Sequence, residues 1–179
     1  MEKLRGKEFR MKTLFLIGGT MGVGKTTACR ILKRKLPACV FLDGDWCWDM
    51  NPFSVTEETK AMVMENIRFL LNQFLRCSEF ENVVFCWVMH RQEILDGILS
   101  GLSLDGCRVC AVSLICEEEE LTKRLRKDVE AGLREADVIG RSAARIGLYE
   151  KLSTIKVDVT HLTPGETAEG ILAAAGMKE

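Results

Sequence analysis

The chain has 179 residues, a length that fits one domain with a single hydrophobic core. Its 25 lysines and arginines nearly balance its 26 aspartates and glutamates, and the formal net charge of -1 argues against a general attraction to nucleic acid or to an anionic membrane. The apolar runs are far shorter than the roughly 20 residues that cross a bilayer, so we expect no membrane span.

The cysteine count, eight, is high for a chain of this composition. Cys39, Cys86 and Cys116 lie in or beside apolar runs, where a free thiol packs as a small hydrophobic group. Cys107 and Cys110 have C-x-x-C spacing, but a zinc site needs about four ligands and no second pair follows. Because residues 1–12 are charged and lack an apolar export signal, we expect reduced thiols in a cytoplasmic protein.

Apolar runs typical of strands alternate with stretches of helical periodicity along the chain. Five strands are expected, at residues 13–17, 39–42, 83–89, 109–115 and 155–159. A helix is expected over residues 25–36, where Pro37 ends it, and Ser54-Val55-Thr56-Glu57 predicts a capping box for a long helix.

The second half of the chain continues the alternation. Short helices are expected over residues 94–102 and from residue 117 onward, and another ends near residue 152. Thr163-Pro164-Gly165-Glu166 predicts the start of a final helix. Strands that alternate with helices imply right-handed crossovers and a parallel sheet, so the fold class is α/β.

A glycine-rich segment between the first strand and the first helix matches the pattern G-x-x-x-x-G-K-[ST], known as Walker A. The matching residues are Gly19, Thr20, Met21, Gly22, Val23, Gly24, Lys25 and Thr26. The glycines let backbone amides point at phosphate oxygens, Lys25 can reach the β- and γ-phosphates, and the Thr26 hydroxyl is a ligand for Mg²⁺. With Thr27 in the same helical turn, this segment predicts an ATP site at a helix N-terminus.

Two classes of phosphate-loop protein are disfavoured. Motor ATPases hold Mg²⁺ through an acid at the end of a second apolar strand, but residues 83–89 run into His90 and residues 109–115 into Cys116. GTPases read their base with Asn-Lys-x-Asp, and the segment Ile155-Lys156-Val157-Asp158 lacks the asparagine.

Acidic residues follow the second strand instead, in Asp43-Gly44-Asp45. A carboxylate at the carboxyl end of a strand beside the phosphate loop can accept a proton from a substrate hydroxyl or bind Mg²⁺ through water. We expect Asp45 to be the base and Asp43 to orient the substrate or hold the metal, although the sequence is also consistent with the reverse assignment. Trp46 and Trp48 offer flat apolar surface for an acceptor.

Arginines gather between the fourth and fifth strands, in a segment that also contains glycines. Arg134 and Arg141 are expected to stabilise charge on a migrating phosphoryl group, within a lid over residues 124–145. Arg91, at the carboxyl end of the third strand, is expected to meet the acceptor.

Together, the phosphate loop, Asp43-Gly44-Asp45, the arginine-bearing segment and five strands resemble the nucleoside monophosphate kinase-like P-loop kinases. The resemblance covers about residues 13–175 and is closest to the branch with gluconate, adenylylsulfate, shikimate and chloramphenicol kinases. It implies a three-layer fold with sheet order 2-3-1-4-5, ATP and Mg²⁺, and phosphoryl transfer to a small-molecule hydroxyl. It also implies that Arg124 stacks on adenine and that Arg134, Arg141 or Arg145 contacts the phosphates.

The chain departs from this family after the third strand, where nucleoside monophosphate kinases carry D-G-F-P-R. Here residues 87–91 keep only the arginine, which argues against a nucleotide acceptor. We therefore expect a cytoplasmic small-molecule kinase, monomeric or homodimeric, with one domain over residues 13–179 after a flexible extension at residues 1–12. A nucleotide or nucleoside kinase and an ATP-binding regulatory module without an acceptor are the alternatives.

Overall fold

The computed structural model of the protein describes residues 11–177. Its strands are β1 (Lys12–Gly19), β2 (Cys39–Asp43), β3 (Asn82–Cys86), β4 (Cys107–Ile115) and β5 (Ile155–Asp158). They form one parallel sheet in the order β2-β3-β1-β4-β5, which confirms the α/β class and the predicted order. Residues 1–10, most of the expected flexible extension, lie outside the described residues.

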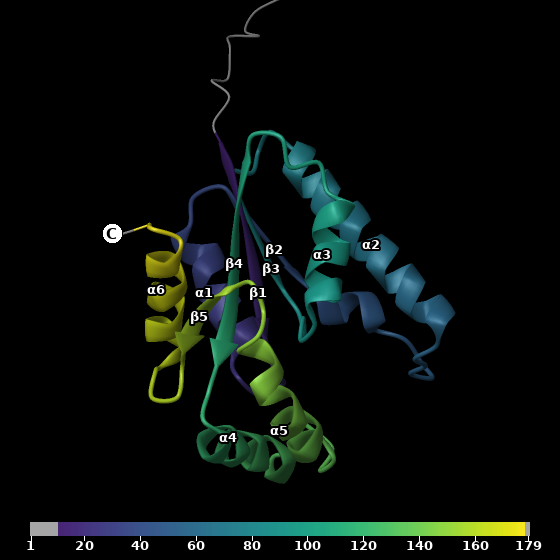
Figure 1. Cartoon of the computed structure of the whole chain (residues 1–179), viewed down its shortest axis with the longest axis vertical. Helices are drawn as coiled ribbons and strands as arrows, with labels where there is room; N and C mark the ends of the chain where they lie inside the picture. The colour runs from purple at the N-terminus through teal and green to yellow at the C-terminus, as the bar shows by residue number, and fades with distance from the viewer. Residues whose placement is uncertain (1–10, 178–179) are drawn as a thin grey trace, which may run out of the picture.

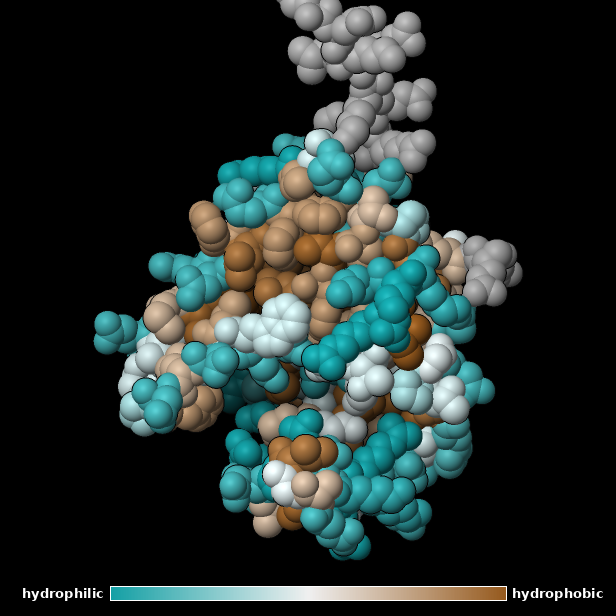
Figure 2. All heavy atoms as spheres, turned by 180° about the vertical axis from the view of Figure 1, so that it is seen from behind, coloured by the Kyte–Doolittle hydropathy of each residue, from teal (hydrophilic) through white to brown (hydrophobic). Residues whose placement is uncertain are grey.

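Helices cover both faces of this sheet. They are α1 (Lys25–Lys35), the 3-10 helix η1 (Gly44–Trp48), α2 (Glu57–Arg76), α3 (Gln92–Ser100), α4 (Glu118–Glu130), α5 (Val138–Tyr149) and α6 (Pro164–Ala174). Helices α1 and α6 lie on one face and α2 and α3 on the other, whereas α4 and α5 lie beyond the carboxyl end of β4 (Figure 1). Seen from behind, the surface is hollowed between the part that holds α4 and α5 and the rest of the molecule (Figure 2).

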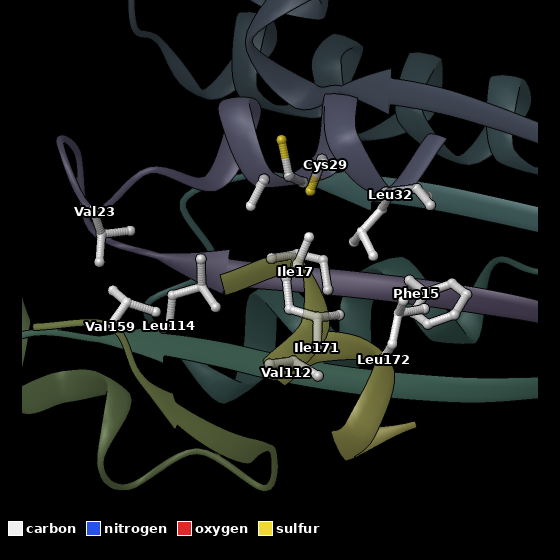
Figure 3. Packing of buried hydrophobic residues seen from close by; sticks show 14 of the residues in the cluster. Phe15, Ile17, Val23, Cys29, Leu32, Val112, Leu114, Val159, Ile171 and Leu172 are labelled. Atoms are coloured by element: carbon white, nitrogen blue, oxygen red, sulfur yellow. The ribbon is translucent and has the colours of Figure 1, made fainter. Parts of the chain in front are cut away.

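Alternating side chains of β1 enter two separate core layers. Phe15 and Ile17 pack with α1 and α6, and the labelled residues of Figure 3 show this layer around Ile17. Leu14 and Leu16 pack on the opposite face, in the layer that α2 and α3 cover. All four side chains are fully buried, and such burial contributes about 1.5–3 kcal/mol per side chain. The central strand therefore fixes the position of the turn that follows it.

The strand register brings the carboxyl ends of the strands to one edge of the sheet. Ile17 in β1 aligns with Cys86 in β3, which in turn aligns with Asp43 in β2. Asp43 thus lies two strands away from β1, at the level where β1 approaches the glycine-rich turn. This register positions the acids that follow β2 beside the phosphate loop.

The third strand ends earlier than its apolar run predicts. The run continues to Met89, but β3 ends at Cys86. The backbone N–H of Trp87 still donates a hydrogen bond to the carbonyl of Ile17. The N–H of Met89, however, donates to the carbonyl of Trp87 in the same segment rather than to a neighbouring strand. Residues 87–89 therefore leave the sheet and turn toward the site.

The cap of α2 also differs from its prediction. The N-cap is Thr56, whose hydroxyl accepts from the Thr59 N–H at 3.1 Å, while Thr59 Oγ1 accepts from the Thr56 N–H at 2.8 Å. Ser54 contributes only its carbonyl, which accepts from Thr59 Oγ1 at 3.0 Å. The capping box is therefore formed by Thr56 and Thr59, whereas the predicted start of α6 at Thr163 is confirmed.

The C-x-x-C pair lies inside β4. Cys110 packs in the layer beneath α1 and α6, and Cys107 packs against the opposite layer. Since the two thiols lie on opposite faces of the sheet, they cannot share a ligand. None of the helices within residues 11–177 has both the length and the apolar composition that a membrane crossing requires.

Candidate active site

The glycine-rich segment forms the turn between β1 and α1. Gly22 has φ 81°, a conformation that favours glycine, and a Cβ there would lie 2.4 Å from Cδ2 of Leu125 in α4. The helix then begins at Lys25 after Gly24, which is its N-cap. The turn therefore presents the N-terminus of α1 at the carboxyl edge of the sheet, where an anion is stabilised by free N–H groups and by the helix dipole.

Lys25 lies buried inside this turn. Its Nζ donates a hydrogen bond of 2.9 Å to the carbonyl of Thr20. Burial lowers the pKa of the Lys25 ammonium, and Cys86, Asp45 and Asp43 partly oppose this effect. The lysine is thus held in the loop close to both acids of the Asp43-Gly44-Asp45 segment.

Thr26 and Asp43 connect the loop to the end of β2. The Thr26 hydroxyl donates to Asp43 Oδ2 at 2.7 Å, and Asp43 Oδ1 accepts from the backbone N–H of Asp45 at 3.1 Å. Asp43 is buried and also caps η1. A hydroxyl and a carboxylate at this separation supply the hard oxygen donors that Mg²⁺ prefers.

Asp45 lies in η1 with its side chain partly exposed. Desolvation by the surrounding protein and the neighbouring Asp43 carboxylate raise the pKa of Asp45, and Lys25, Trp87 and Arg134 oppose this shift. Of the two carboxyl groups, Asp45 is therefore the one that remains open to a ligand.

Trp87 is a part of the site that the sequence analysis did not assign individually. Its side chain lies close enough to the Asp45 carboxyl to lower the pKa of that group, and a Cβ on Gly44 would lie 2.5 Å from its Cγ. The tryptophan thus requires glycine at position 44. The signal in the sequence was its place directly after the buried part of the third strand, next to the strand that carries the acids.

The other two tryptophans of the segment differ in environment. Trp46 is 54% exposed and meets Phe41 edge-on, with ring centroids 5.4 Å apart. Trp48 packs against the core layer beneath α2, with its ring centroid 5.9 Å from that of Phe53. Trp46 therefore offers open surface, whereas Trp48 anchors the loop.

The predicted arginines fall into separate environments. Arg124 in α4 donates to the carbonyls of Val159 and Thr160 at 2.9 and 2.8 Å and pairs with Glu120. Arg134 pairs with Asp128 at 2.9 Å and lies close enough to Asp45 to lower its pKa.

Arg141 and Arg91 are both exposed. Arg141 pairs with Asp137 one turn earlier in the chain, at 3.0 Å, whereas Arg91 is the N-cap residue of α3. The structure therefore brings Lys25, Thr26, Asp43, Asp45 and Arg134 together, and holds Arg141 within its own helix.

Helix α5 is tied to the phosphate loop directly. Thr20 Oγ1 donates to the carbonyl of Ser142 at 3.1 Å, and both residues are buried. Movement of α5 would therefore be transmitted to the loop.

A phosphate-binding turn between β1 and α1, with acids at the end of β2, defines a P-loop nucleotide-binding protein. The chain belongs to the AAA domain family, whose model matches residues 16–140. A comparison with curated protein sequences gives no match.

Several solved structures share the whole fold. The tunicamycin resistance protein of Deinococcus radiodurans is 20% identical, with a TM-score of 0.68 over 93% of this chain and 97% of that one. A gluconokinase from Sinorhizobium meliloti 1021 is 17% identical, with a TM-score of 0.67 over 93% of each chain. The Mycobacterium tuberculosis APS kinase, solved with AMPPNP and APS, is 14% identical, with a TM-score of 0.60 over 93% of this chain and 98% of that one. At these identities the likeness is one of fold, and it confirms the resemblance to P-loop kinases at that level.

Proposed function

We propose that the protein is a cytoplasmic kinase that transfers the γ-phosphoryl group of ATP to a hydroxyl of a small molecule, with Mg²⁺. The observation that carries the proposal is the contact between Thr26 of the phosphate loop and Asp43 at the end of β2, beside the accessible Asp45. Two of the structural neighbours bear the names of small-molecule kinases, which supports this reading of the site.

ATP would be held mainly by the backbone of the phosphate loop and by Lys25. The amides at the start of α1 would bind the phosphate oxygens, since they have no partner inside the helix. Arg124 would face the adenine, and its hydrogen bonds to two carbonyls after β5 hold its guanidinium plane in place.

Mg²⁺ would be held by the Thr26 hydroxyl, with Asp43 reached directly or through water. When bound, the ion neutralises charge on the phosphates. The two oxygen-bearing side chains already lie within hydrogen-bond distance, and Asp43 is fixed by the Asp45 N–H, so little reorganisation is needed.

Asp45 is the better candidate for the base that takes the acceptor proton. Both oxygens of Asp43 accept hydrogen bonds within the protein, whereas Asp45 is open to a ligand. A raised pKa also makes Asp45 a better proton acceptor than an ordinary carboxylate.

The arginines of residues 124–145 would form the lid. Arg134 is the first choice for the group that stabilises the migrating phosphoryl charge, because it already lies near Asp45. Arg141 would act only after release from Asp137, with which it forms an exposed ion pair.

The test is incubation of the protein with γ-labelled ATP and separate pools of sugars, hydroxy acids, nucleosides and nucleotides. Labelled product in a small-molecule pool, absent with Asp45→Asn, supports the proposal. Transfer only to nucleosides or nucleotides would identify the alternative kinase class. ATP binding without transfer to any pool would identify a regulatory module instead.

A further inference from the structure

Two buried hydroxyl groups lie on one face of α5 without a hydrogen-bond partner. The side chains of Ser142 and Tyr149 are 0% and 1% exposed, and neither Ser142 Oγ nor the Tyr149 hydroxyl forms a hydrogen bond within residues 11–177. The two residues are seven positions apart, so they share a face of the helix. Buried hydroxyls in folded proteins are nearly always paired, so two unpaired ones on one face call for a physical explanation.

Contacts place this face of α5 against the start of the phosphate loop. The Ser142 carbonyl accepts from Thr20 Oγ1 at 3.1 Å. Cε1 of Tyr149 lies 3.7 Å from the position that a Cβ on Gly18 would take, so the ring packs on the last part of β1. Burial raises the pKa of Tyr149, and the Gly19 N–H is one of the groups that oppose this shift, although it is not in hydrogen-bond geometry with the hydroxyl. Both side chains therefore lie where the strand becomes the loop.

The loop contains an acceptor whose present donor has another task in the proposed reaction. Lys25 Nζ donates to the carbonyl of Thr20 at 2.9 Å, and Thr20 is buried. When ATP binds, the Lys25 ammonium would be drawn to the phosphates. The Thr20 carbonyl would then be a buried acceptor without a donor, which is costly. This carbonyl belongs to the same residue whose side chain is already bonded to Ser142.

We propose that Ser142 and Tyr149 are positioning residues of the phosphate loop, whose hydroxyls donate to the Thr20 carbonyl once nucleotide has drawn Lys25 away from it. A backbone carbonyl has two lone pairs, so it can accept from both hydroxyls. This inference rests on the proposed binding of ATP by Lys25 and adds a role for α5. The exchange leaves the ammonium free for the phosphates, because the Thr20 carbonyl no longer competes for it. Since α5 begins within the predicted lid, the exchange also links nucleotide binding to the position of the lid.

The first test compares the free protein with its nucleotide complex. Removal of a hydroxyl without a partner should not lower stability, so Ser142→Ala and Tyr149→Phe should match or exceed the wild-type thermal midpoint in the absence of nucleotide. Affinity for a non-hydrolysable ATP analogue with Mg²⁺ should fall about three- to tenfold in each variant, because the hydroxyl is paired only in the complex. The matched control is Ser100→Ala, an exposed serine at the end of α3, which should bind the analogue as the wild type does. Unchanged analogue affinity in both variants would overturn the proposal, whatever their midpoints.

The second test needs no nucleotide. Lys25→Met removes the present donor permanently, so in this background the hydroxyls should already be paired with the Thr20 carbonyl. Ser142→Ala should therefore lower the thermal midpoint of the Lys25→Met protein but not that of the wild type, and the double-mutant cycle measures this coupling. Equal effects in both backgrounds would contradict the exchange and would indicate a constant partner, such as an internal water. If the wild type failed to bind the analogue, the proposed function would fail, but this cycle would still test the exchange.

A spectroscopic test follows from the composition. Tyr149 is the only tyrosine of the chain, so labelling with 3-fluorotyrosine gives a single ¹⁹F resonance. This resonance should move when the analogue binds, and in Lys25→Met without nucleotide it should already lie near the bound position. A resonance that bound analogue leaves in place would contradict the assigned role of Tyr149.

Discussion

The Thr26 hydroxyl donates a hydrogen bond of 2.7 Å to Asp43 Oδ2 and so joins the start of α1 to the carboxyl end of β2. The two residues are 17 positions apart in the chain, with the rest of α1 between them. Their contact follows from the sheet register, which aligns Asp43 with the last paired residues of β1 and β3. A change at either residue is therefore expected to alter metal binding more than folding.

Asp43→Asn should weaken the Mg²⁺ dependence of the reaction. The amide oxygen of asparagine can still accept from the Asp45 N–H, so η1 keeps its cap, but the negative charge near the metal is lost. We expect the Mg²⁺ concentration for half-maximal transfer to rise about 10- to 100-fold, as for other groups that support a bound metal. A Mg²⁺ titration of turnover measures this, with Asp49→Asn, an exposed acid after η1, as the control.

Asp45→Asn should stabilise the fold at neutral pH while transfer is lost. The pKa of Asp45 is raised in the folded protein, so folding disfavours its ionised form, and the wild type loses stability as pH rises through that pKa. The thermal midpoint of the variant should exceed that of the wild type at pH 7, and the difference should vanish once the pH falls below the ordinary carboxyl range. A lower midpoint for the variant at pH 7 would contradict the assigned environment of Asp45.

The same raised pKa predicts the pH dependence of turnover. Protonated Asp45 cannot accept the acceptor proton, so kcat/KM should fall as pH falls through a pKa above the ordinary carboxyl range. A pH profile of kcat/KM at saturating ATP and Mg²⁺ measures this limb. If kcat/KM instead fell at the usual pKa of an aspartate, another group would be the one that accepts the proton.

Gly44→Ala should both destabilise the protein and impair the site. The added Cβ would lie 2.5 Å from Cγ of Trp87, so the indole beside the Asp45 carboxyl must move. Overpacking of this kind costs about 1–3 kcal/mol, which a denaturant titration would detect. The control is Gly147→Ala in α5, where a Cβ has no neighbour within 4 Å and a gain of up to about 1 kcal/mol is expected from helix propensity.

Lys25→Met should abolish most of the transfer and leave the fold intact. Burial lowers the pKa of Lys25, which shows that the ammonium is costly to keep charged in the folded protein, so an isosteric apolar chain should not reduce the thermal midpoint at pH 7. We expect turnover to fall by about two to three orders of magnitude, the usual effect of removing one preorganised charge-stabilising group. Lys33→Met, on the exposed side of the same helix, should retain wild-type turnover.

Most of the fold could be predicted from the sequence because its signals are local. The apolar run of β1, the glycine-rich turn and the proline after α1 are each signals carried by neighbouring residues. The end of β3 could not, because residues 87–89 continue the apolar run although pairing with β1 stops at Cys86. The cap of α2 was misplaced for a similar reason, since Ser54 and Thr56 are both good cap residues in sequence terms.

The site was predictable in part. The phosphate loop and the acids after β2 follow from motif and strand order, so their proximity was expected. The role of Trp87 was not, because it depends on a contact between segments distant in the chain, that of Trp87 with Gly44. The sequence likewise did not reveal that Asp43 is buried whereas Asp45 is exposed, because this difference depends on how η1 follows β2 in the folded protein.

The most direct test of the kinase assignment is a time course of label transfer from γ-labelled ATP to the small-molecule pools, with wild type, Asp45→Asn and Lys33→Met compared side by side. Binding of the ATP analogue is measured in parallel on the same preparations. The wild type and Lys33→Met should form labelled product, whereas Asp45→Asn should bind the analogue equally well and form none. Turnover by Asp45→Asn at the wild-type rate, or analogue binding by the wild type without transfer to any pool, would contradict the account.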